Sequence, residues 1–587
     1  MPPSDPWISA PICGNTPRDE AACPTMDTGS AGSGQRAAGS GQQAADDRSV
    51  LFAVRSAAAL HRLLDTLPVF AGDRRIRRLF TLVPGSDFDI GALAAIERAG
   101  ARTLPWAEAC RRSFRLILAA SPKGELHRLA GPLLLLPHGA GFNKTVPKEG
   151  SDGLASGLDP VHLLVDGQPL ARVHALAHPS QLDRLAEHCP PAAARATVVG
   201  DPTLDRLLES AALREDYRAA LGTGGRRLIV LTSTWGPESL LAARPGLPAR
   251  LAAELPYDGY QLALVVHPNE YSATGGFDLA QELAPALGAG MVLARPHEEW
   301  AALLVAADAV ITDHGSTALY AAALDRPVLT AADGGPELIP GSPMDRLLTH
   351  SPRLAGRESI DAALHAHRPG SARSLVQEAF AEQGRALELL RREVYAQLGL
   401  TPPPGPVTAA PLPRPGPPPQ RPSAFAVRTH RQGDEVRVER FAAHLAPPAQ
   451  HLAAEYGSAG ERATHSAGLL YLRAGAAPAA EQGTGWTVDG WTRRILAERP
   501  ACRMAAVILP SGECVARPRG AGLFSVRTEP RREPDGRLVF PDPAAALSAV
   551  YAAADRLPGD LTCGIGGHGH RVRVRPASAR EAGRLLR

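Results

Sequence analysis

The sequence has few cysteines, and none of them stand in the spacing of a metal or redox site. No C-x-x-C pair occurs, which excludes a zinc ribbon and a redox dithiol. An odd number of scattered thiols is typical of a protein of the reducing cytoplasm. The seven cysteines are Cys13, Cys23, Cys110, Cys189, Cys502, Cys514 and Cys563.

Long apolar runs are also missing. No stretch reaches the ~18 consecutive apolar residues that a membrane-spanning helix needs. The first residues lack the basic region and apolar run of a signal peptide. The sequence therefore predicts a soluble, cytoplasmic protein. Peripheral association with the inner face of a membrane stays open, because such a contact needs no spanning segment.

The chain has no strong excess of charge of either sign. Lysine and arginine total 63, and aspartate and glutamate total 60, so a nucleic-acid partner is not predicted. The pattern G-x-x-x-x-G-K-[ST] is absent as well. The string GFNKT has no glycine directly before Lys144, which excludes a P-loop and therefore a translation or GTPase factor.

With 587 residues, the chain is too long for one core, since domains run to roughly 100–200 residues. Residues 1–48 contain few large apolar side chains, so we expect a disordered tail there and the first order at Val50. Residues 401–423 hold 11 prolines and predict a stiff linker. Residues 424–587 predict an α+β domain of unknown role, with two hairpins at Gly-Asp and Pro-Ser-Gly turns and a helix near 544–556.

Between the tail and the linker, short apolar runs alternate with helix-like stretches. Such runs are typical of parallel sheets, and two series of them predict two Rossmann-like domains, residues 49–205 and 206–400. An apolar stripe predicts a helix over residues 375–398 that ends at Gly399. The fold class is therefore α/β. The predicted strands are Val50–Val54, Leu79–Val83, Leu116–Ala120, Leu133–Leu136 and Leu163–Val165, then Leu228–Leu231, Leu262–Val266, Met291–Ala294, Ala309–Thr312 and Val328–Thr330.

A histidine follows an apolar strand in LLLLPHGAGFNKTVP. His138 begins a glycine-rich loop, and Asn143 and Lys144 lie close behind it. Ligands of open α/β sheets bind beyond the carboxyl ends of the strands. A histidine there can act as a general base, and a lysine can meet a phosphate. The alternative is a structural histidine at a strand-to-loop turn.

The second series places polar residues after two of its strands. Thr234 ends the cluster in RLIVLTSTW, where hydroxyl and N–H groups can reach a ligand, although such clusters also serve as helix caps. His267 follows the strand in LALVVHPNEY. A lone histidine of this kind has a structural alternative, but a matching histidine in the other half favours one shared site.

A third strand of this series, in AVITDHGSTALYAAAL, ends at Thr312 and leads through a short loop into an alanine-rich helix. The free N–H groups and the positive end of a helix favour an anion, and a glycine lets the backbone approach a diphosphate. The order of strand, loop and helix predicts a phosphate site; the alternative is an ordinary helix cap. The loop residues are Asp313, His314, Gly315, Ser316 and Thr317.

One further histidine pair lies near the end of the sequence. His568 and His570 form an H-x-H pair in a glycine-rich turn, but no carboxylate or third ligand is adjacent. A flexible hairpin turn explains the pair better than a metal site. No metal ligands are therefore predicted.

Together these motifs resemble the CDP-glycerol glycerophosphotransferase family, bacterial enzymes that polymerise glycerol phosphate for teichoic acids of the cell envelope. PHG at His138 is similar to the family's WHG-type motif. The strings at Ser233-Thr234-Trp235 and His267-Pro268 are similar to its PTW and histidine-proline motifs. The family's donor loop, roughly D-Y-S-S followed by a helix and a K/R-P element, resembles Asp313–Ser316 and Arg326-Pro327.

The sequence departs from the family's pattern at three positions. Pro137 stands where the family has tryptophan, Gly315 replaces the first serine of the donor pair, and Tyr320 replaces an acidic residue on the following helix. Two of these departures, at Gly315 and Tyr320, lie in the donor motif, and Pro137 lies in the N-terminal histidine motif. They leave the identity of the donor open.

The resemblance implies a glycosyltransferase-B arrangement of the two Rossmann-like domains. It implies that His138 and His267 are the catalytic histidines, with His138 the acceptor base and His267 also a ligand of the donor diphosphate, together with Ser316 and Thr317. The implied activity is metal-independent transfer of a glycerophosphate or glycosyl group from a nucleotide-diphosphate donor to a hydroxyl acceptor, without a cofactor. The rival hypothesis is a non-catalytic module that holds a nucleotide or a protein. Oligomeric state is not predicted.

Overall fold

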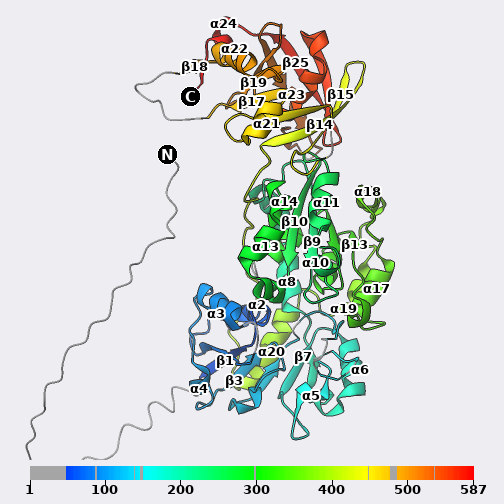
Figure 1. Cartoon of the computed structure of the whole chain (residues 1–587). Helices are drawn as coiled ribbons and strands as arrows, with labels where there is room; N and C mark the ends of the chain where they lie inside the picture. The colour runs from blue at the N-terminus through cyan, green and yellow to red at the C-terminus, as the bar shows by residue number, and fades with distance from the viewer. Residues whose placement is uncertain are drawn as a thin grey trace, which may run out of the picture. The chain divides into compact units, whose positions relative to one another are not determined.

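The computed structural model, drawn in Figure 1, describes residues 48–85, 89–137, 139–145, 150–151, 153–155, 157–295, 299–446, 449–475, 485–534 and 536–586. All of them belong to one compact unit, Asp46–Arg587. The predicted tail, apart from Arg48, lies outside the described residues, and so does the candidate base His138. Within these ranges, no helix combines the length and the apolarity needed to cross a membrane.

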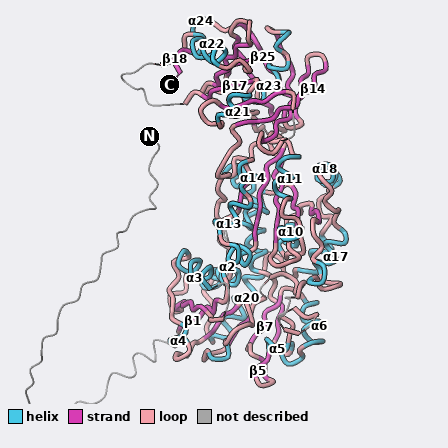
Figure 2. The backbone as a smooth tube through the Cα atoms, viewed as in Figure 1, coloured by secondary structure: helices cyan, strands magenta, loops and turns pink. Residues whose placement is uncertain are grey.

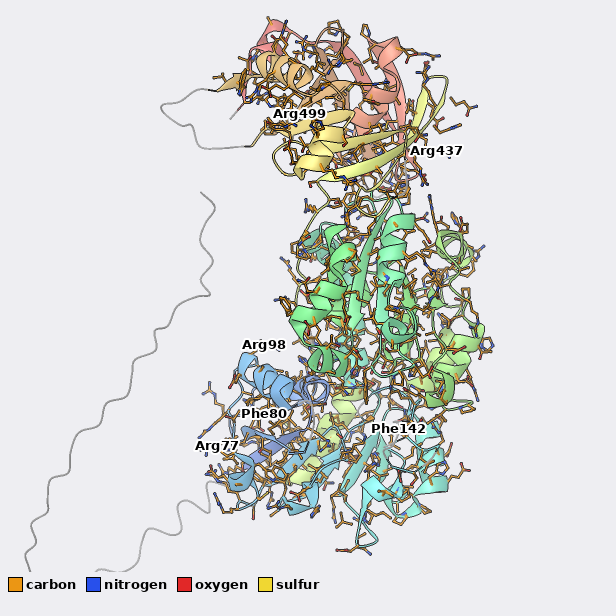
Figure 3. The ribbon with its side chains drawn as sticks, viewed as in Figure 1. Arg77, Phe80, Arg98, Phe142, Arg437 and Arg499 are labelled. Carbon is orange, nitrogen blue, oxygen red and sulfur yellow. The ribbon has the colours of Figure 1, made fainter. Side chains whose placement is uncertain are left out.

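The first sheet has six parallel strands in the order β2-β1-β3-β4-β7-β8. Its inner strand β1 is buried along its whole length, as expected for a parallel strand covered on both faces. Phe52 of β1 stacks on Phe80 of β2, with ring centroids 4.6 Å apart; Phe80 is labelled in Figure 3. The strands are β1 (Ser49–Val54), β2 (Arg77–Leu82), β3 (Leu116–Ala119), β4 (Leu133–Leu135), β7 (Val173–Leu176) and β8 (Ala196–Val198).

One predicted strand of this sheet is wrong. The run at Leu163–Val165 ends the short helix α5 (Pro160–Leu163) and forms β5 (Leu164–Val165), which pairs only with β6 (Gln168–Pro169) in a small hairpin. Asp159 caps α5 by accepting the Val161 N–H, and this cap favours the helical turn over an extended strand. The sheet continues instead through β7 and β8, which the sequence analysis did not identify.

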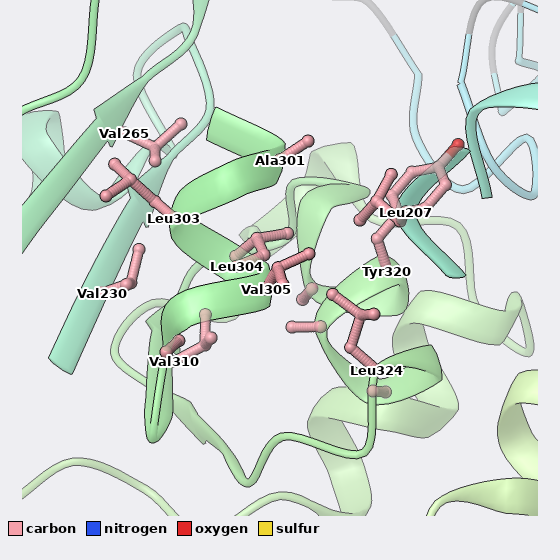
Figure 4. Packing of buried hydrophobic residues seen from close by; sticks show 14 of the residues in the cluster. Leu207, Val230, Val265, Ala301, Leu303, Leu304, Val305, Val310, Tyr320 and Leu324 are labelled. Carbon is pink, nitrogen blue, oxygen red and sulfur yellow. The ribbon is translucent and has the colours of Figure 1, made fainter. Parts of the chain in front are cut away.

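The second sheet has five parallel strands in the order β11-β10-β9-β12-β13, and all five overlap predicted strands. Buried side chains of α15 (Trp300–Ala306) and α16 (Thr317–Ala323) pack on one of its faces, as Figure 4 shows for Leu304 and Val305. The strands are β9 (Arg227–Ser233), β10 (Tyr260–Val266), β11 (Val292–Leu293), β12 (Ala309–Thr312) and β13 (Val328–Thr330).

The helix predicted over residues 375–398 is interrupted. The chain forms α19 (Arg373–Ala379) and α20 (Ala386–Leu398), and a turn with Gly384 at φ +78° separates them. Asp205 holds this turn by accepting the N–H groups of Gly384 and Leu387. The apolar stripe is nevertheless buried: its α20 part packs into the core of the first sheet. Gly399, in the left-handed region, ends α20 as predicted.

Residues 401–423 contain no helix or strand, but part of this segment is fixed to the protein. Ala409 and Leu412 are buried, each in a different core cluster. Arg206 donates hydrogen bonds to the carbonyls of Ala410 and Pro411 at 3.0 and 3.2 Å. We refer to residues 409–416 as the strap.

The C-terminal part contains a sheet of nine strands that closes on itself, in the order β14-β15-β24-β25-β21-β20-β19-β17-β16. Figure 2 labels β14, β17 and β25 in this part of the chain. The two predicted hairpins are present as the antiparallel pairs β14–β15 and β19–β20, and the helix expected near 544–556 is α23 (Pro543–Ala552), buried within the core. The strands are β14 (Ala424–Gln432), β15 (Glu435–Ala442), β16 (His451–Glu455), β17 (Leu469–Arg473), β19 (Met504–Ile508), β20 (Cys514–Pro518), β21 (Phe524–Thr528), β24 (Gly559–Ile565) and β25 (His568–Pro576).

Arg440 joins this closed sheet to the second parallel sheet. Its side chain on β15 has no exposed surface, donates two hydrogen bonds to Asp258 at 2.6 and 2.8 Å, and donates a third to Asp542 at 2.8 Å. Burial alone would raise the pKa of Asp542, but the Arg440 and Arg473 guanidinium groups outweigh it and hold that pKa well below its ordinary range. The buried guanidinium therefore needs both carboxylates to remain paired.

Candidate functional site

A cavity of about 420 Å³ lies where the carboxyl ends of strands from both parallel sheets meet. Pro137 and Gly139 line it just after β4 of the first sheet, Thr234 after β9, and His267 after β10. The loop after β12 contributes as well. This is the position at which ligands of open α/β sheets bind. The candidate residues of the two sequence series therefore line one cavity, except for Asp313, described below, and for His138, which lies outside the described residues.

Two hydroxyls at the start of α16 line the cavity. Ser316 occupies the N-cap position, yet its side chain makes no capping hydrogen bond. Within the described residues, the backbone N–H groups of Ser316 and Thr317 have no acceptor. A Cβ added to Gly139 would lie 3.2 Å from the Ser316 hydroxyl, so the loop of the first sheet faces this helix start closely. The arrangement offers hydroxyl and N–H donors to an anion.

Asp313 does not line the cavity, in contrast to the expectation of a direct phosphate contact. Its carboxylate is fully buried and accepts the N–H groups of Thr234, Leu240 and Gly315 at 2.7–2.8 Å. Burial raises the pKa of Asp313, and the three N–H donors oppose that shift. Asp313 thus positions the loops after β9 and β12, and the N–H of Gly315 is already used.

Glu337 ties the loop of the first sheet to the loop after β12. It ends η4 (Gly335–Glu337), and its Oε2 lies 3.3 Å from Lys144 Nζ and 3.1 Å from His314 Nε2. Gly334, at φ +80°, lies so close to the imidazole that a Cβ there would come within 2.4 Å of His314 Cγ. Glu337 was not predicted as a site residue, because it comes seven residues after the predicted strand Val328–Thr330 and belongs to none of the motifs.

Burial shifts the pKa of both side chains that contact Glu337. It lowers the pKa of His314, although neighbouring carboxylates raise it again in part. It also lowers the pKa of Lys144, and the Glu337 carboxylate opposes this shift. A neutral His314 that donates from Nε2 presents Nδ1 as an acceptor. Within the described part of the chain this buried Nδ1 has no partner.

Lys144 and His267 both lie close to Trp235. Lys144 Nζ is 5.1 Å from the centroid of the Trp235 ring, within range of a cation–π contact, and the Trp235 and His267 rings are 6.3 Å apart. His267 Nδ1 accepts the N–H of Asn269 and so caps α12 (Pro268–Thr274). The neutral ring therefore carries its proton on Nε2. His267 therefore caps α12 and also lines the cavity.

The loop that follows His138 is fixed from two sides. Arg184 donates to the carbonyls of Gly141 and Phe142 at 3.0 and 2.9 Å, and Phe142 is labelled in Figure 3. On the other side, the N–H of Ile339 donates to the carbonyl of Asn143, and the N–H of Thr145 donates to that of Glu337. The two sheets thus hold this loop jointly beside the cavity.

The end of the cavity away from Lys144 combines apolar and polar groups. Tyr320, one turn after Thr317 on α16, donates to Asp201 at 2.7 Å and accepts from Arg62 at 2.5 Å. Its ring meets Trp300 edge-on with centroids 5.6 Å apart, and Figure 4 shows it beside the same packed helices. This end is lined by Trp300, Ala301, Tyr320, Thr203, Arg206 and Leu412. None of them was predicted as a site residue.

His174 is a further lining residue that the sequence analysis did not find. It lies on β7, is almost fully buried, and its Nδ1 has no partner among the described residues. Burial lowers its pKa to about 4, so the ring is neutral at physiological pH. His174 was not predicted because its strand was not predicted. The strand is the four-residue run VHAL, which is short and contains a histidine, so it does not stand out as an apolar run.

Replacing Glu337 with alanine should lower the free energy of unfolding by about 1–3 kcal/mol. The change leaves the buried His314 and the partly exposed Lys144 without their shared acceptor, and an unsatisfied buried polar group has a cost of that size. Chemical denaturation measures the loss. The matched control is Glu238→Ala, which removes a second carboxylate close to η4, beside Gly335. This control should change stability by less than about 0.5 kcal/mol; equal losses in the two variants would contradict the assignment.

The described residues contain no group of three or more histidine, cysteine, aspartate or glutamate side chains placed to hold a metal ion. His568 and His570 lie on β25, and His570 Nδ1 is 3.4 Å from the carbonyl of Glu529. The pair forms the start of a strand that is hydrogen-bonded to β24.

Comparisons with known proteins identify no family for the chain. No family model matches it, and no curated protein matches it. Among solved structures, the wall teichoic acid polymerase TagF is similar at 12% identity over 60% of this chain and 90% of that one, with a TM-score of 0.42. S. aureus MnaA with UDP is similar at 11% identity over 62% and 100%, with a TM-score of 0.38. Anabaena HepE with UDP and glucose is similar at 15% identity over 60% and 99%, with a TM-score of 0.36.

Proposed function

We propose that the chain is a metal-independent transferase that moves a glycerophosphate or glycosyl group from a nucleotide-diphosphate donor to an acceptor hydroxyl. One observation carries the proposal: a single cavity of about 420 Å³ collects the polar residues that follow the strands of both parallel sheets. A volume of this size suits a small-molecule ligand. The proposed arrangement is that of a glycosyltransferase-B fold.

The donor diphosphate is assigned to the Lys144 end of the cavity. Ser316 and Thr317 supply hydroxyl and N–H donors there, Thr234 lines the same end, and Lys144 supplies a positive charge. Hydrogen bonds to a charged phosphate are roughly twice as strong as neutral ones. Asp313 takes part by holding the loops, and His314 lines the site from the Glu337 side.

The acceptor hydroxyl is assigned to the side of the first sheet. His138 is proposed to remove its proton while the acceptor oxygen bonds to the transferred group and the bond to the nucleotide breaks. Sequence position supports this role, since the neighbours Pro137 and Gly139 line the cavity. The negative charge that develops on the departing nucleotide is met by Lys144, by the N–H groups of α16 and by His267, so the chain itself provides the stabilisation.

Replacing Ser316 and Thr317 together with alanine tests the donor site. Loss of two hydrogen bonds to a charged group, each about 1.5–3 kcal/mol, should weaken nucleotide binding by at least about tenfold in isothermal titration against CDP, UDP, GDP and dTDP. The control is Ser342→Ala, which removes a hydroxyl that caps α17 (Pro343–His350) outside the cavity. It should cost about 0.5–2 kcal/mol of stability without changing affinity. Unchanged affinity in the double variant would refute the donor site.

The rival function is a non-catalytic nucleotide-binding module of the same fold. Tyr320 favours it, because this residue stands where the resembling family has an acidic group and its hydroxyl is already bound to Asp201 and Arg62. The two functions differ in turnover. Nucleotide binding without any release of nucleoside monophosphate (from glycerophosphate transfer) or nucleoside diphosphate (from glycosyl transfer) from a CDP-, UDP-, GDP- or dTDP-linked donor, in the presence of hydroxyl acceptors, would favour the module.

A further inference from the structure

The strap forms part of the cavity wall, although it belongs to the proline-rich segment outside both parallel sheets. Leu412 lines the cavity and is 7% exposed. It belongs to the same buried cluster as Ala301 and Tyr320, and Trp300 packs against that cluster. A residue of the connecting segment therefore completes the apolar end of the site.

Hydrogen bonds on both sides fix Leu412 in place. Its N–H donates to the Ser210 hydroxyl at 3.1 Å, and its carbonyl accepts from the Tyr217 hydroxyl at 2.9 Å. The carbonyls of the two residues before it accept from Arg206, which also bonds Asp65, the C-cap of α2 (Ala57–Leu64), at 2.8 Å. Arg206 itself lines the cavity. The strap is thus held to both parallel sheets at the site.

A second attachment links the strap to the start of α15. The N–H of Gly416 donates to Glu299 Oε1 at 2.7 Å, and Glu299 also accepts the backbone N–H of Arg295 at 2.7 Å. Glu299 is 2% exposed and directly precedes Trp300 at the start of α15. The strap and the cavity wall at Trp300 are therefore joined through one buried carboxylate.

We propose that the strap is the specificity element for the nucleoside of the donor, with Leu412 in contact with the base. This inference rests on the proposed function, which puts the diphosphate at Ser316 and Thr317. Tyr320 lies one helical turn beyond Thr317, so the adjoining space towards Leu412 is where the nucleoside lies. Apolar and aromatic walls suit a flat heteroaromatic base, and a few polar groups orient it.

Binding of two different ligands distinguishes the contact at Leu412 from the phosphate site. Isothermal titration with inorganic pyrophosphate reports the phosphate end alone, and titration with the tightest of CDP, UDP, GDP and dTDP reports both ends. Leu412→Ala should weaken the nucleoside diphosphate by about tenfold or more, as a missing apolar contact in a pocket does, and should leave pyrophosphate within about twofold. The matched control is Val407→Ala, an apolar residue of the same segment that packs on the first sheet.

Leu412→Phe keeps the wall apolar and narrows the space, so it should weaken purine nucleotides more than pyrimidine nucleotides. Circular dichroism melting of all variants identifies any loss of folding. A partly unfolded Leu412→Phe variant would bind purine and pyrimidine nucleotides less tightly by the same factor, so the ratio of the two affinities still reports the shape of the site. A wild-type chain that binds no nucleoside diphosphate overturns the proposed function itself. Wild-type binding that Leu412→Ala leaves unchanged overturns the role of the strap alone.

Discussion

Replacing Arg440 with methionine is expected to lower the free energy of unfolding by about 3–5 kcal/mol, the usual cost of removing one partner from a buried ion pair. Asp258 loses the guanidinium that accounts for both of its described side-chain hydrogen bonds, whereas Asp542 keeps Arg473 at 2.8 Å. Chemical denaturation of the whole chain measures the loss. The control is Arg437→Met, an exposed arginine on the same strand (Figure 3), which should change stability by less than about 0.5 kcal/mol.

Two further measurements identify the source of this loss. Asp258→Asn in the Arg440→Met background should recover part of it, because the unpaired charge is removed. The low pKa of Asp542 in the folded protein means that its stabilisation is present above the unfolded value of about 3.9 and is lost as the pH falls below it. The difference between wild type and variant should therefore shrink in acid. An equal difference at about pH 7 and about pH 3 would contradict the ion-pair explanation.

Replacing His138 with alanine is expected to reduce turnover by about 10²–10⁴-fold, the usual contribution of a general base, while nucleotide affinity is retained. The physical reason is that a base acts on the acceptor hydroxyl, whereas the donor is held by α16 and Lys144. Turnover is measured as release of the nucleoside monophosphate or diphosphate from the donor, and affinity by titration. His138→Gln should be as inactive as His138→Ala, because an amide can hydrogen-bond but cannot accept the proton.

The matched control is His365→Ala, on the exposed end of α18 (Arg357–Ala366), which should retain full turnover. Full turnover in His138→Ala would contradict the assignment of His138 as the general base. A parallel loss of nucleotide affinity would instead place His138 among the donor ligands.

The strand-end residues of the site could be predicted because one topological rule decides their position. The carboxyl ends of parallel strands lie at one edge of a sheet, so Thr234, His267 and the loop after β12 had to be neighbours. The rule does not determine which residue of a loop faces the ligand. Asp313 and Ser316 belong to the same predicted loop, yet the carboxylate turns inward to three N–H groups while the hydroxyl lines the cavity.

Contacts between distant segments could not be predicted, since no local pattern encodes them. Glu337 comes 23 residues after His314 in a short turn with no apolar periodicity. The closure of the nine-stranded sheet depends on the parallel pairing of β15 with β24, two strands that lie far apart along the chain. A proline-rich composition correctly indicated a segment without helix or strand, but the burial of Leu412 depends on the surface that receives it.

The attachment of the strap also determines where this chain can be divided in evolution or in the laboratory. A fragment that ends at Leu400 loses the apolar side chains of Ala409 and Leu412, and thereby uncovers the cores on which they pack. A fragment that extends through Gly416 keeps every hydrogen bond described for the strap. The closed sheet can therefore be exchanged for another domain only when the proline-rich segment as far as Gly416 stays with the parallel sheets.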